Sequence, residues 1–344
     1  MLFRSEGAAR VLSAYPPRTV RAFFARIGLE TVEEDEGRVY PASLQAASVL
    51  DALRLAIPHY GGTLRTGARV VDIRPAKRGG FSITLEDGTA LNAEKTLIAA
   101  GGLAAPKLGG CADGARLLEA LGHTSTPRFS SIAALKTDSR LTRSVKGQRL
   151  RGTIAVTVDG ETARAESGEI LFGEDALSGI ASMQLARCCQ EALRRGRKPV
   201  AYIRAADMDF NRFALRASTL EDYPLENLLT GLVPKRIGME LVKRAGLDLH
   251  ASVSSLTRKA LKTLWTTVSD WTFPIVGVAG YEQAQVMAGG VRLDEFRLET
   301  MESRRVPGLY AAGEVLDVDG DCGGYNLQWA WASGLVAANG MHNA

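Results

Sequence analysis

The chain has 344 residues, of which 46% are hydrophobic and 23% are charged, and its net charge at pH 7 is +4. This composition is that of a globular protein and excludes a disordered or collagen-like chain. The length predicts about two domains, each large enough to bury its own core.

Three further features narrow the class of protein. The longest apolar run, Thr96–Leu103, is far shorter than the roughly 20 residues of a membrane-spanning helix, so no membrane association is expected. The four cysteines form no CxxC pair and lack the density of a secreted scaffold, which indicates the cytoplasm. Basic residues cluster only at Arg194, Arg195, Arg197 and Lys198, where a helix is expected to end, so no nucleic-acid partner is expected.

The first part of the chain predicts two helices. A short amphipathic helix is expected to begin near Pro16 and Pro17, because apolar residues follow them at helical spacing. A second helix is expected after Ser43, which can cap it, and it should stop near Pro58. The segment Gly37–Pro41 between them is expected to be a turn.

A small β-meander is expected next. Arg69–Ile73 has the pattern of a strand, and Phe81–Glu86 and Thr89–Ala100 flank Asp87–Gly88, a strong hairpin signal. The end of the last strand is fully apolar and runs into Gly101–Gly102. That pattern is typical of a buried strand in a parallel sheet.

A different module is expected from residue 130 to residue 280. Thr153–Val158 and Glu161–Ala165 predict a hairpin around Asp159–Gly160, and Pro224–Leu264 is mostly helical in pattern. The chain then returns to an apolar strand in Gly308–Glu314, which ends on a glycine as the earlier strand does. Residues 1–129 and 281–344 are therefore expected to form one discontinuous α/β domain, with residues 130–280 inserted into it.

Chemistry is expected where these two strands end. In open α/β sheets, ligands lie outside the carboxyl ends of the strands, although Gly101–Gly102 alone could be only a tight turn. The run Gly323–Gln328 leads straight into an apolar helix, and the N-terminus of a helix attracts negative charge. A reduced flavin carries such charge along its N1–O2 edge, and Asn326 and Gln328 could add hydrogen bonds.

The C-terminal motifs carry a specific resemblance. Thr300–Ser303, Pro307–Tyr310, Gly313–Glu314 and Gly323–Ala330 together resemble the signature of the BaiN-like flavoproteins, also called the aminoacetone-oxidase family. Further matches extend the resemblance over nearly the whole chain. It implies a Rossmann-like FAD-binding domain with an inserted β-barrel-like and helical domain.

The resemblance also implies roles for individual residues. Val70 would meet the adenine through its backbone, Ala100 and Gly101 would lie near the diphosphate and ribityl chain, and Glu314 would approach the ribityl chain. The residues Gly323 to Gln328 would line the flavin ring. The implied cofactor-binding set is Val70, Ala100, Gly101, Gly313, Glu314, Gly323, Gly324, Tyr325, Asn326, Leu327 and Gln328.

Two departures from the family pattern stand out. The family opens with a strand, a GxGxxG turn and a helix, and nothing in this sequence corresponds to them, so the first strands of the nucleotide fold are expected to be missing. In addition, Gly173–Glu174 stands where the family usually has a Thr-His pair. The four histidines are dispersed, and no catalytic residue is assigned.

The leading functional hypothesis is an FAD-dependent oxidoreductase that acts on a small or steroid-like organic substrate, with NAD(P)H or oxygen as the redox partner. The alternative is a truncated or degenerate flavoprotein that binds FAD weakly or not at all and serves as a binding protein. A third hypothesis, a flavoprotein acting on tRNA, is less favoured because the basic residues are scattered.

The missing fingerprint yields the first testable prediction. The chain as given is expected to bind FAD weakly or not at all, because the glycine turn and helix N-terminus for the diphosphate are absent. An extension of roughly 60 upstream residues, a length implied by the family resemblance, should restore binding. Both forms would be purified and titrated with FAD. Tight, stoichiometric binding by the shorter form would show that another segment replaces the fingerprint.

Overall fold

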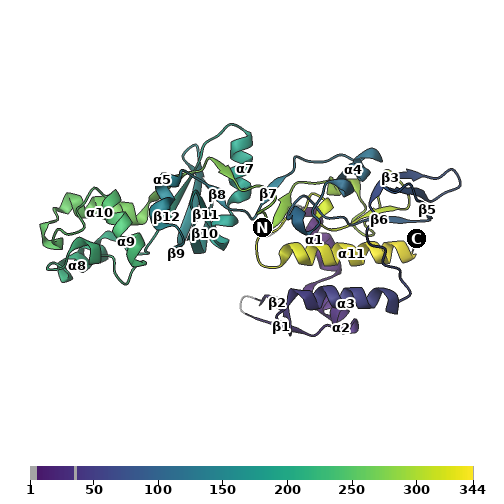
Figure 1. The fold of residues 1–344 in the computed structure, drawn as a ribbon, viewed down its shortest axis with the longest axis horizontal. Helices are drawn as coiled ribbons and strands as arrows, with labels where there is room; N and C mark the ends of the chain where they lie inside the picture. The colour runs from purple at the N-terminus through teal and green to yellow at the C-terminus, as the bar shows by residue number, and fades with distance from the viewer. Residues whose placement is uncertain (1–5, 35–36, 344) are drawn as a thin grey trace. The chain divides into compact units, whose positions relative to one another are not determined.

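The computed structural model describes residues 6–34 and 37–343, and the chain divides into two compact units. The first unit combines the residues up to Phe129 with those from Val286 onward, and the second is the continuous stretch Ser130–Gln285. The chain therefore leaves the first unit once and returns to it once, as the colours of Figure 1 show. Within the described residues, no helix has the length and apolar character needed to cross a membrane.

A pair of parallel strands lies at the centre of the first unit. β6 (Thr96–Ile98) pairs with β16 (Leu309–Ala311), with Thr96 opposite Leu309 and Ile98 opposite Ala311. This pairing confirms that the apolar end of the meander is a strand of a parallel sheet. The buried core of the unit includes Leu118, Phe296, Met301, Leu309, Val315 and Trp329.

An antiparallel meander precedes this pair and consists of β3 (Val70–Pro75), β4 (Phe81–Leu85) and β5 (Ala90–Ala93). The predicted turn at Asp87–Gly88 is confirmed: Gly88 has a φ of +84°, and the Asp87 carboxylate accepts a hydrogen bond from the Thr89 N–H at 2.8 Å. The segment Thr89–Ala100, predicted as one strand, contains two, β5 and β6, with a bend at residues 94–95.

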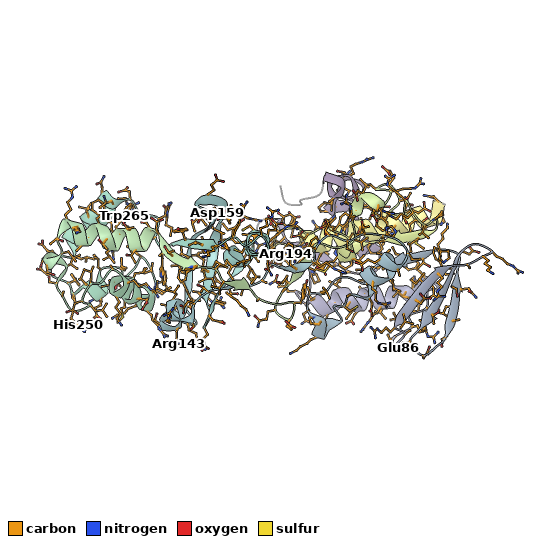
Figure 2. The ribbon with its side chains drawn as sticks, turned by 90° about the horizontal axis from the view of Figure 1, so that it is seen from above. Glu86, Arg143, Asp159, Arg194, His250 and Trp265 are labelled. Atoms are coloured by element: carbon orange, nitrogen blue, oxygen red, sulfur yellow. The ribbon has the colours of Figure 1, made fainter. Side chains whose placement is uncertain are left out.

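Ion pairs hold the meander to α4 (Asp113–Ala120). The Arg69 guanidinium lies 2.8 Å from the Asp113 carboxylate and 2.9 Å from Glu86, which is labelled in Figure 2. Arg116 of α4 also donates to the carbonyl of Val71 at 3.1 Å. Because these groups are exposed or half-buried, the ion pairs add little to the free energy of unfolding. Their main effect is to orient the meander against α4.

Two helices, α1 (Glu6–Ala14) and α2 (Pro17–Arg26), pack against the long C-terminal α11 (Tyr325–Asn343). The ring of Phe24 meets that of Trp331 edge to face, with the centroids 5.1 Å apart. The predicted helix at the prolines is therefore confirmed, and α11 begins four residues before the expected Trp329.

The segment between α2 and the next helix departs from the prediction. β1 (Thr31–Glu33) pairs with β2 (Val39–Pro41) in an antiparallel hairpin, so the prediction that Gly37–Pro41 is a turn was wrong. α3 (Ala46–His59) is preceded by Gln45 at the N-cap, and Ser43 does not cap it. None of the α3 residues is buried.

The second unit is built on a seven-stranded antiparallel sheet. The strands follow the order β13 (Trp271–Pro274), β12 (Pro199–Arg204), β9 (Arg149–Val158), β10 (Glu161–Phe172), β11 (Ala176–Ser178), β8 (Leu135–Lys136) and β14 (Gly277–Val278). β13 and β14 follow each other in the chain but lie at opposite edges. The N–H groups of Ile275 and Val276 donate to Pro199 and Lys136, so the two edges meet and the sheet curls into a barrel.

The turn between β9 and β10 follows the predicted hairpin. Asp159 and Gly160 have φ values of +53° and +86°, as a type I′ turn requires, and Arg197 lies 3.5 Å from the Asp159 carboxylate. Inside the barrel, the rings of Phe172, Trp271 and Phe273 contact one another with centroids 4.9–6.1 Å apart, and those of Phe172 and Trp271 are stacked.

Helices complete the second unit. They are α5 (Ser139–Thr142), α6 (Ile180–Met183), α7 (Ala186–Arg194), α8 (Phe210–Thr219), α9 (Lys235–Arg244) and α10 (Arg258–Ser269). The predicted helix after Pro234 is confirmed as α9. On α10, the indole N–H of Trp265 donates to the carbonyl of Met208 at 3.0 Å (Figure 2). The chain enters this unit at β7 (Phe129–Ser131) and leaves it before β15 (Val286–Ala288).

The contact between α2 and α11 can be tested by substitution. Replacing Phe24, which is 6% exposed, with alanine should lower the free energy of unfolding of the first unit by about 3–4 kcal/mol, because a cavity replaces the ring against Trp331. The matched control is Leu108→Ala in the same unit, since Leu108 is 90% exposed and its loss should change stability by about 0.5 kcal/mol or less. Urea denaturation measures both, and equal losses would contradict the proposed packing role.

Candidate functional site

The two central strands end side by side on glycine turns. Beyond the paired residues, the N–H of Ala312 donates to the carbonyl of Ile98 at 3.1 Å. Gly101 and Gly313 follow, with φ values of +70° and +76°, in the left-handed region that favours glycine. A methyl group added to Gly101 would meet nothing within 4 Å, so a ligand can approach the backbone there.

A half-buried carboxylate, that of Glu314, joins three segments at this end of the sheet. Glu314 accepts a hydrogen bond from the N–H of Met287 at 2.8 Å and a second from the N–H of Gly102. A Cβ atom on Gly102 would lie 2.8 Å from Glu314 Oε2 and from Met287 Cε, so a larger residue here would displace these two side chains. Burial raises the pKa of Glu314, while the two backbone hydrogen bonds oppose that rise.

The N-terminus of α11 is attached to the same end of the sheet. The indole N–H of Trp329 donates to the carbonyl of Gly313 at 3.0 Å, and Ser333 Oγ accepts from the Gly313 N–H at 3.0 Å. Gly323 and Gly324 precede the helix with φ values of +127° and +90°. The helix therefore begins near the strand ends, and the first N–H groups of a helix have no partner within it.

The side-chain amides expected to bind the cofactor have protein partners. Asn326 Oδ1 accepts from the N–H of Gly320 at 2.8 Å, and its Nδ2 donates to the Gly320 carbonyl at 3.0 Å. Gln328 Nε2 donates to the carbonyl of Tyr15 at 2.9 Å. Both amides hold the backbone around the helix start, whereas the Leu327 side chain is 59% exposed.

Val70 and Ala100 lie at the edges of this arrangement. Val70 is the first residue of β3, pairs with Leu85 and packs against the core of the unit. Ala100 is exposed in the loop between β6 and Gly101. The hydrogen bonds above join Gly102, Met287, Gly313, Glu314 and Trp329 into one cluster, and none of them includes Val70.

These residues fit the flavin and ribityl portion of FAD. The backbone at Gly101 and Gly324 is open to a ligand, because a Cβ atom on either would meet nothing within 4 Å. Glu314 supplies carboxylate oxygens that can accept hydrogen bonds from hydroxyl groups, and the start of α11 supplies a positive dipole end. For the diphosphate, the sequence contains no GxGxxG turn.

A second polar cluster, formed by the buried residues His123, Glu295 and Ser303, was not predicted from the sequence. His123 Nδ1 lies 2.8 Å from a carboxylate oxygen of Glu295, and its Nε2 lies 2.9 Å from Ser303 Oγ. Ser303 Oγ also accepts from the N–H groups of Arg305 and Val306, which leaves its proton for the histidine. All three hydrogen bonds of Ser303 Oγ are to protein groups, so we interpret the cluster as one that stabilises the fold and the serine as a structural residue, not a nucleophile. Ser303 ends the Thr300–Ser303 motif that resembles the family, and no sequence pattern linked it to His123 or Glu295.

The charge states within this cluster follow from its surroundings. Burial lowers the pKa of His123 below its usual 6.5, although Glu295 opposes the shift, so the ring is neutral at pH 7. Burial alone would raise the pKa of Glu295, but hydrogen bonds from Arg305, Thr124 and His123 outweigh it and lower that pKa to about 2.

The shifted pKa of His123 predicts a dependence of stability on pH. The unfolded state binds a proton at His123 more readily than the folded state, so the free energy of unfolding should fall as the pH drops below about 6.5. His123→Asn should cost about 1–3 kcal/mol at pH 7 and flatten the pH dependence between pH 7 and 5. The control is His250→Asn, because His250 is exposed. Denaturation at several pH values tests this, and an unchanged slope in His123→Asn would refute it.

Two enzymes have sequences similar to that of this chain. It is 31% identical over 337 residues to the 3-dehydro-bile acid delta(4,6)-reductase of Clostridium scindens, which covers 96% of this chain and 82% of that protein. It is 31% identical over 281 residues to the ribosomal RNA dihydrouridine synthase of Escherichia coli, which covers 81% of this chain and 68% of that protein.

A solved structure and a family model complete the comparison. The GidA structure from Aquifex aeolicus aligns with 96% of this chain and 53% of its own length, at 13% identity and a TM-score of 0.35, which is too low to support an inference. The model of the HI0933-like protein Rossmann domain matches residues 3–340. The chain therefore belongs to the HI0933-like Rossmann family, with FAD as its cofactor and FAD-dependent oxidation and reduction as its class of chemistry.

Proposed function

We propose that this chain is an FAD-dependent reductase that saturates a carbon–carbon double bond conjugated to a carbonyl group. The observation that carries this proposal is the chemistry shared by two of its relatives. One is named for reducing the delta(4,6) double bonds of a 3-keto bile acid, and the other for making dihydrouridine, in which the uracil ring has lost its double bond next to a carbonyl. The substrates differ greatly, but the bond that changes is of one kind.

The cluster at the strand ends would hold the cofactor. When bound there, FAD would supply hydride transfer between a reduced donor and the substrate. Glu314 and Gly101 would contact the ribityl chain, and the backbone of Val70 would contact the adenine. The segment Gly323–Gln328 would lie along the flavin ring, where the positive end of α11 favours negative charge.

The proposed substrate is small and steroid-like, and the proposed electron donor is NAD(P)H. The bile-acid reductase aligns with 96% of the chain, compared with 81% for the RNA-modifying relative. Residues 130–280, most of the second unit, would determine which substrate is accepted, while the first unit would carry the redox chemistry. Because the sequence contains no GxGxxG motif, a transient encounter with NAD(P)H is favoured over a dedicated nicotinamide domain.

Reduction of a uridine in RNA is the second candidate, and the similarity to the dihydrouridine synthase is the observation that favours it. The two candidates predict different partners. RNA binding depends strongly on salt, because cationic side chains displace the counterions of the phosphates. A steroid-like substrate would bind with little dependence on salt, because burial of apolar surface drives its binding.

The proposal can be tested with defined substrates. The chain, supplied with excess FAD and NADH or NADPH without oxygen, should add two hydrogens to a 3-keto-4,6-diene bile acid, as measured by mass spectrometry. The matched control is the 3-hydroxy analogue, whose double bonds have no carbonyl to accept charge and should not be reduced. Reduction of uridine in ribosomal RNA, with no change in the bile acid, would favour the second candidate. Absence of product from both substrates would refute the proposal.

A further inference from the structure

One cation from a distant part of the sequence lies beside the start of α11. A Cβ atom on Gly323 would be 4.0 Å from Nε of Arg38, which is half-buried and immediately precedes β2. The charge of Arg38 is also felt by the neighbouring Cys322: burial raises the pKa of that thiol, and the guanidinium opposes the rise. Arg38 and the Cys322–Gly323 turn therefore share one partly desolvated environment.

The fold fixes the position of Arg38 through the β1–β2 hairpin. The N–H of Glu34 donates to the carbonyl of Arg38 at 2.8 Å, and Glu33 pairs with Val39 across the hairpin. Arg21 of α2 lies 2.8 Å from the Glu33 carboxylate and donates to Thr31 Oγ1 at 3.2 Å. These contacts attach the hairpin to α2.

α2 in turn packs on α11. Phe24 meets Trp331 edge to face, and the buried residues Val20, Phe24 and Leu29 contact Trp331 and Leu335. α11 thus contacts α2, α2 contacts the hairpin, and the hairpin places Arg38 beside the N-terminus of α11. This closed set of contacts holds Arg38 in a defined place even though it lies in a short connecting segment.

We propose that Arg38 contacts the N1–O2 edge of the bound flavin and stabilises the negative charge that this edge carries in the reduced cofactor. The inference rests on the proposed function. A hydride brings two electrons and one proton to the neutral oxidised ring, so the reduced ring carries one negative charge unless a further proton arrives. NAD(P)H, the donor, is oxidised to NAD(P)⁺ in the same transfer.

Two features favour Arg38 over the other side chains near the helix start. The amides of Asn326 and Gln328, which were expected to serve this edge, already bond to Gly320 and Tyr15. An arginine has five N–H donors and stays charged, so it can keep a protein partner and still donate to a flavin oxygen. Its full charge would add to the partial positive charge, about half a unit, at the N-terminus of α11.

The test compares how oxidised and reduced FAD bind. Dissociation constants for both forms would be measured without oxygen at up to millimolar FAD for the wild type, Arg38→Gln, Arg38→Lys and the control Arg54→Gln. Arg54 is exposed on α3. Arg38→Gln should weaken binding of reduced FAD about tenfold more than binding of oxidised FAD, which corresponds to a two-electron midpoint potential about 30 mV lower. Arg38→Lys should restore most of the difference, and Arg54→Gln should behave as the wild type.

The outcomes separate this inference from the proposed function. If Arg38→Gln weakens both forms of FAD equally, Arg38 is only structural and the inference is wrong, while the proposed function stands. An unchanged ratio without any loss of affinity would have the same meaning. If the wild type binds neither form at millimolar FAD, the same variants are compared in the form extended by roughly 60 upstream residues. If that form binds no FAD either, both the proposed function and the inference fail.

Discussion

The parallel contact between β6 and β16 is the interaction on which the first unit depends. It joins Thr96–Ile98 to Leu309–Ala311, segments that lie on either side of the entire second unit in the sequence. Because parallel strands end at the same edge, this contact places the Gly101 and Gly313 turns together and brings Glu314 beside Gly102. The helix α11 is then anchored to Gly313 through Trp329. Gly101, Glu314 and the start of α11 thus derive their positions from one short strand pair.

In the first unit, the buried Glu295 and the half-buried Glu314 have surroundings that shift their pKa values in opposite directions. Glu295 has a cationic partner in Arg305 and further hydrogen bonds from His123 and Thr124, and its pKa falls to about 2. Glu314 accepts hydrogen bonds from two backbone N–H groups, and burial raises its pKa. A carboxylate that stays ionised can hold its hydrogen-bond partners in place at all ordinary pH values, which is a structural role. One with a raised pKa is closer to exchanging a proton, which is typical of groups at functional sites.

Local chemistry explains which parts of the fold were predictable. The turns Asp87–Gly88 and Asp159–Gly160 were predicted because an Asp-Gly pair favours a tight hairpin regardless of distant contacts, and both glycines have a positive φ. The family was recognised from contiguous C-terminal motifs, and the family model confirms it. Gly37–Pro41 was mistaken for a turn because its strand has three residues and its partner carries no alternating pattern. The bonding of His123 was missed for another reason: its partners lie far away in the sequence, and no spacing rule links them. The same holds for the position of Arg38. The roles of the predicted cofactor-binding residues remain predictions.

The placement of the second unit between β6 and β16 also bears on how the protein is made. The second unit is one continuous stretch, so it can fold as soon as it leaves the ribosome. The first unit cannot complete its central strand pair until β16 has been synthesised, and closing so long a loop carries an entropic cost that slows folding. Until then the apolar β6 lacks its partner strand, and unpaired strand edges promote aggregation. Synthesis therefore includes an interval in which the early half of the chain needs protection, by a chaperone or by rapid completion of translation.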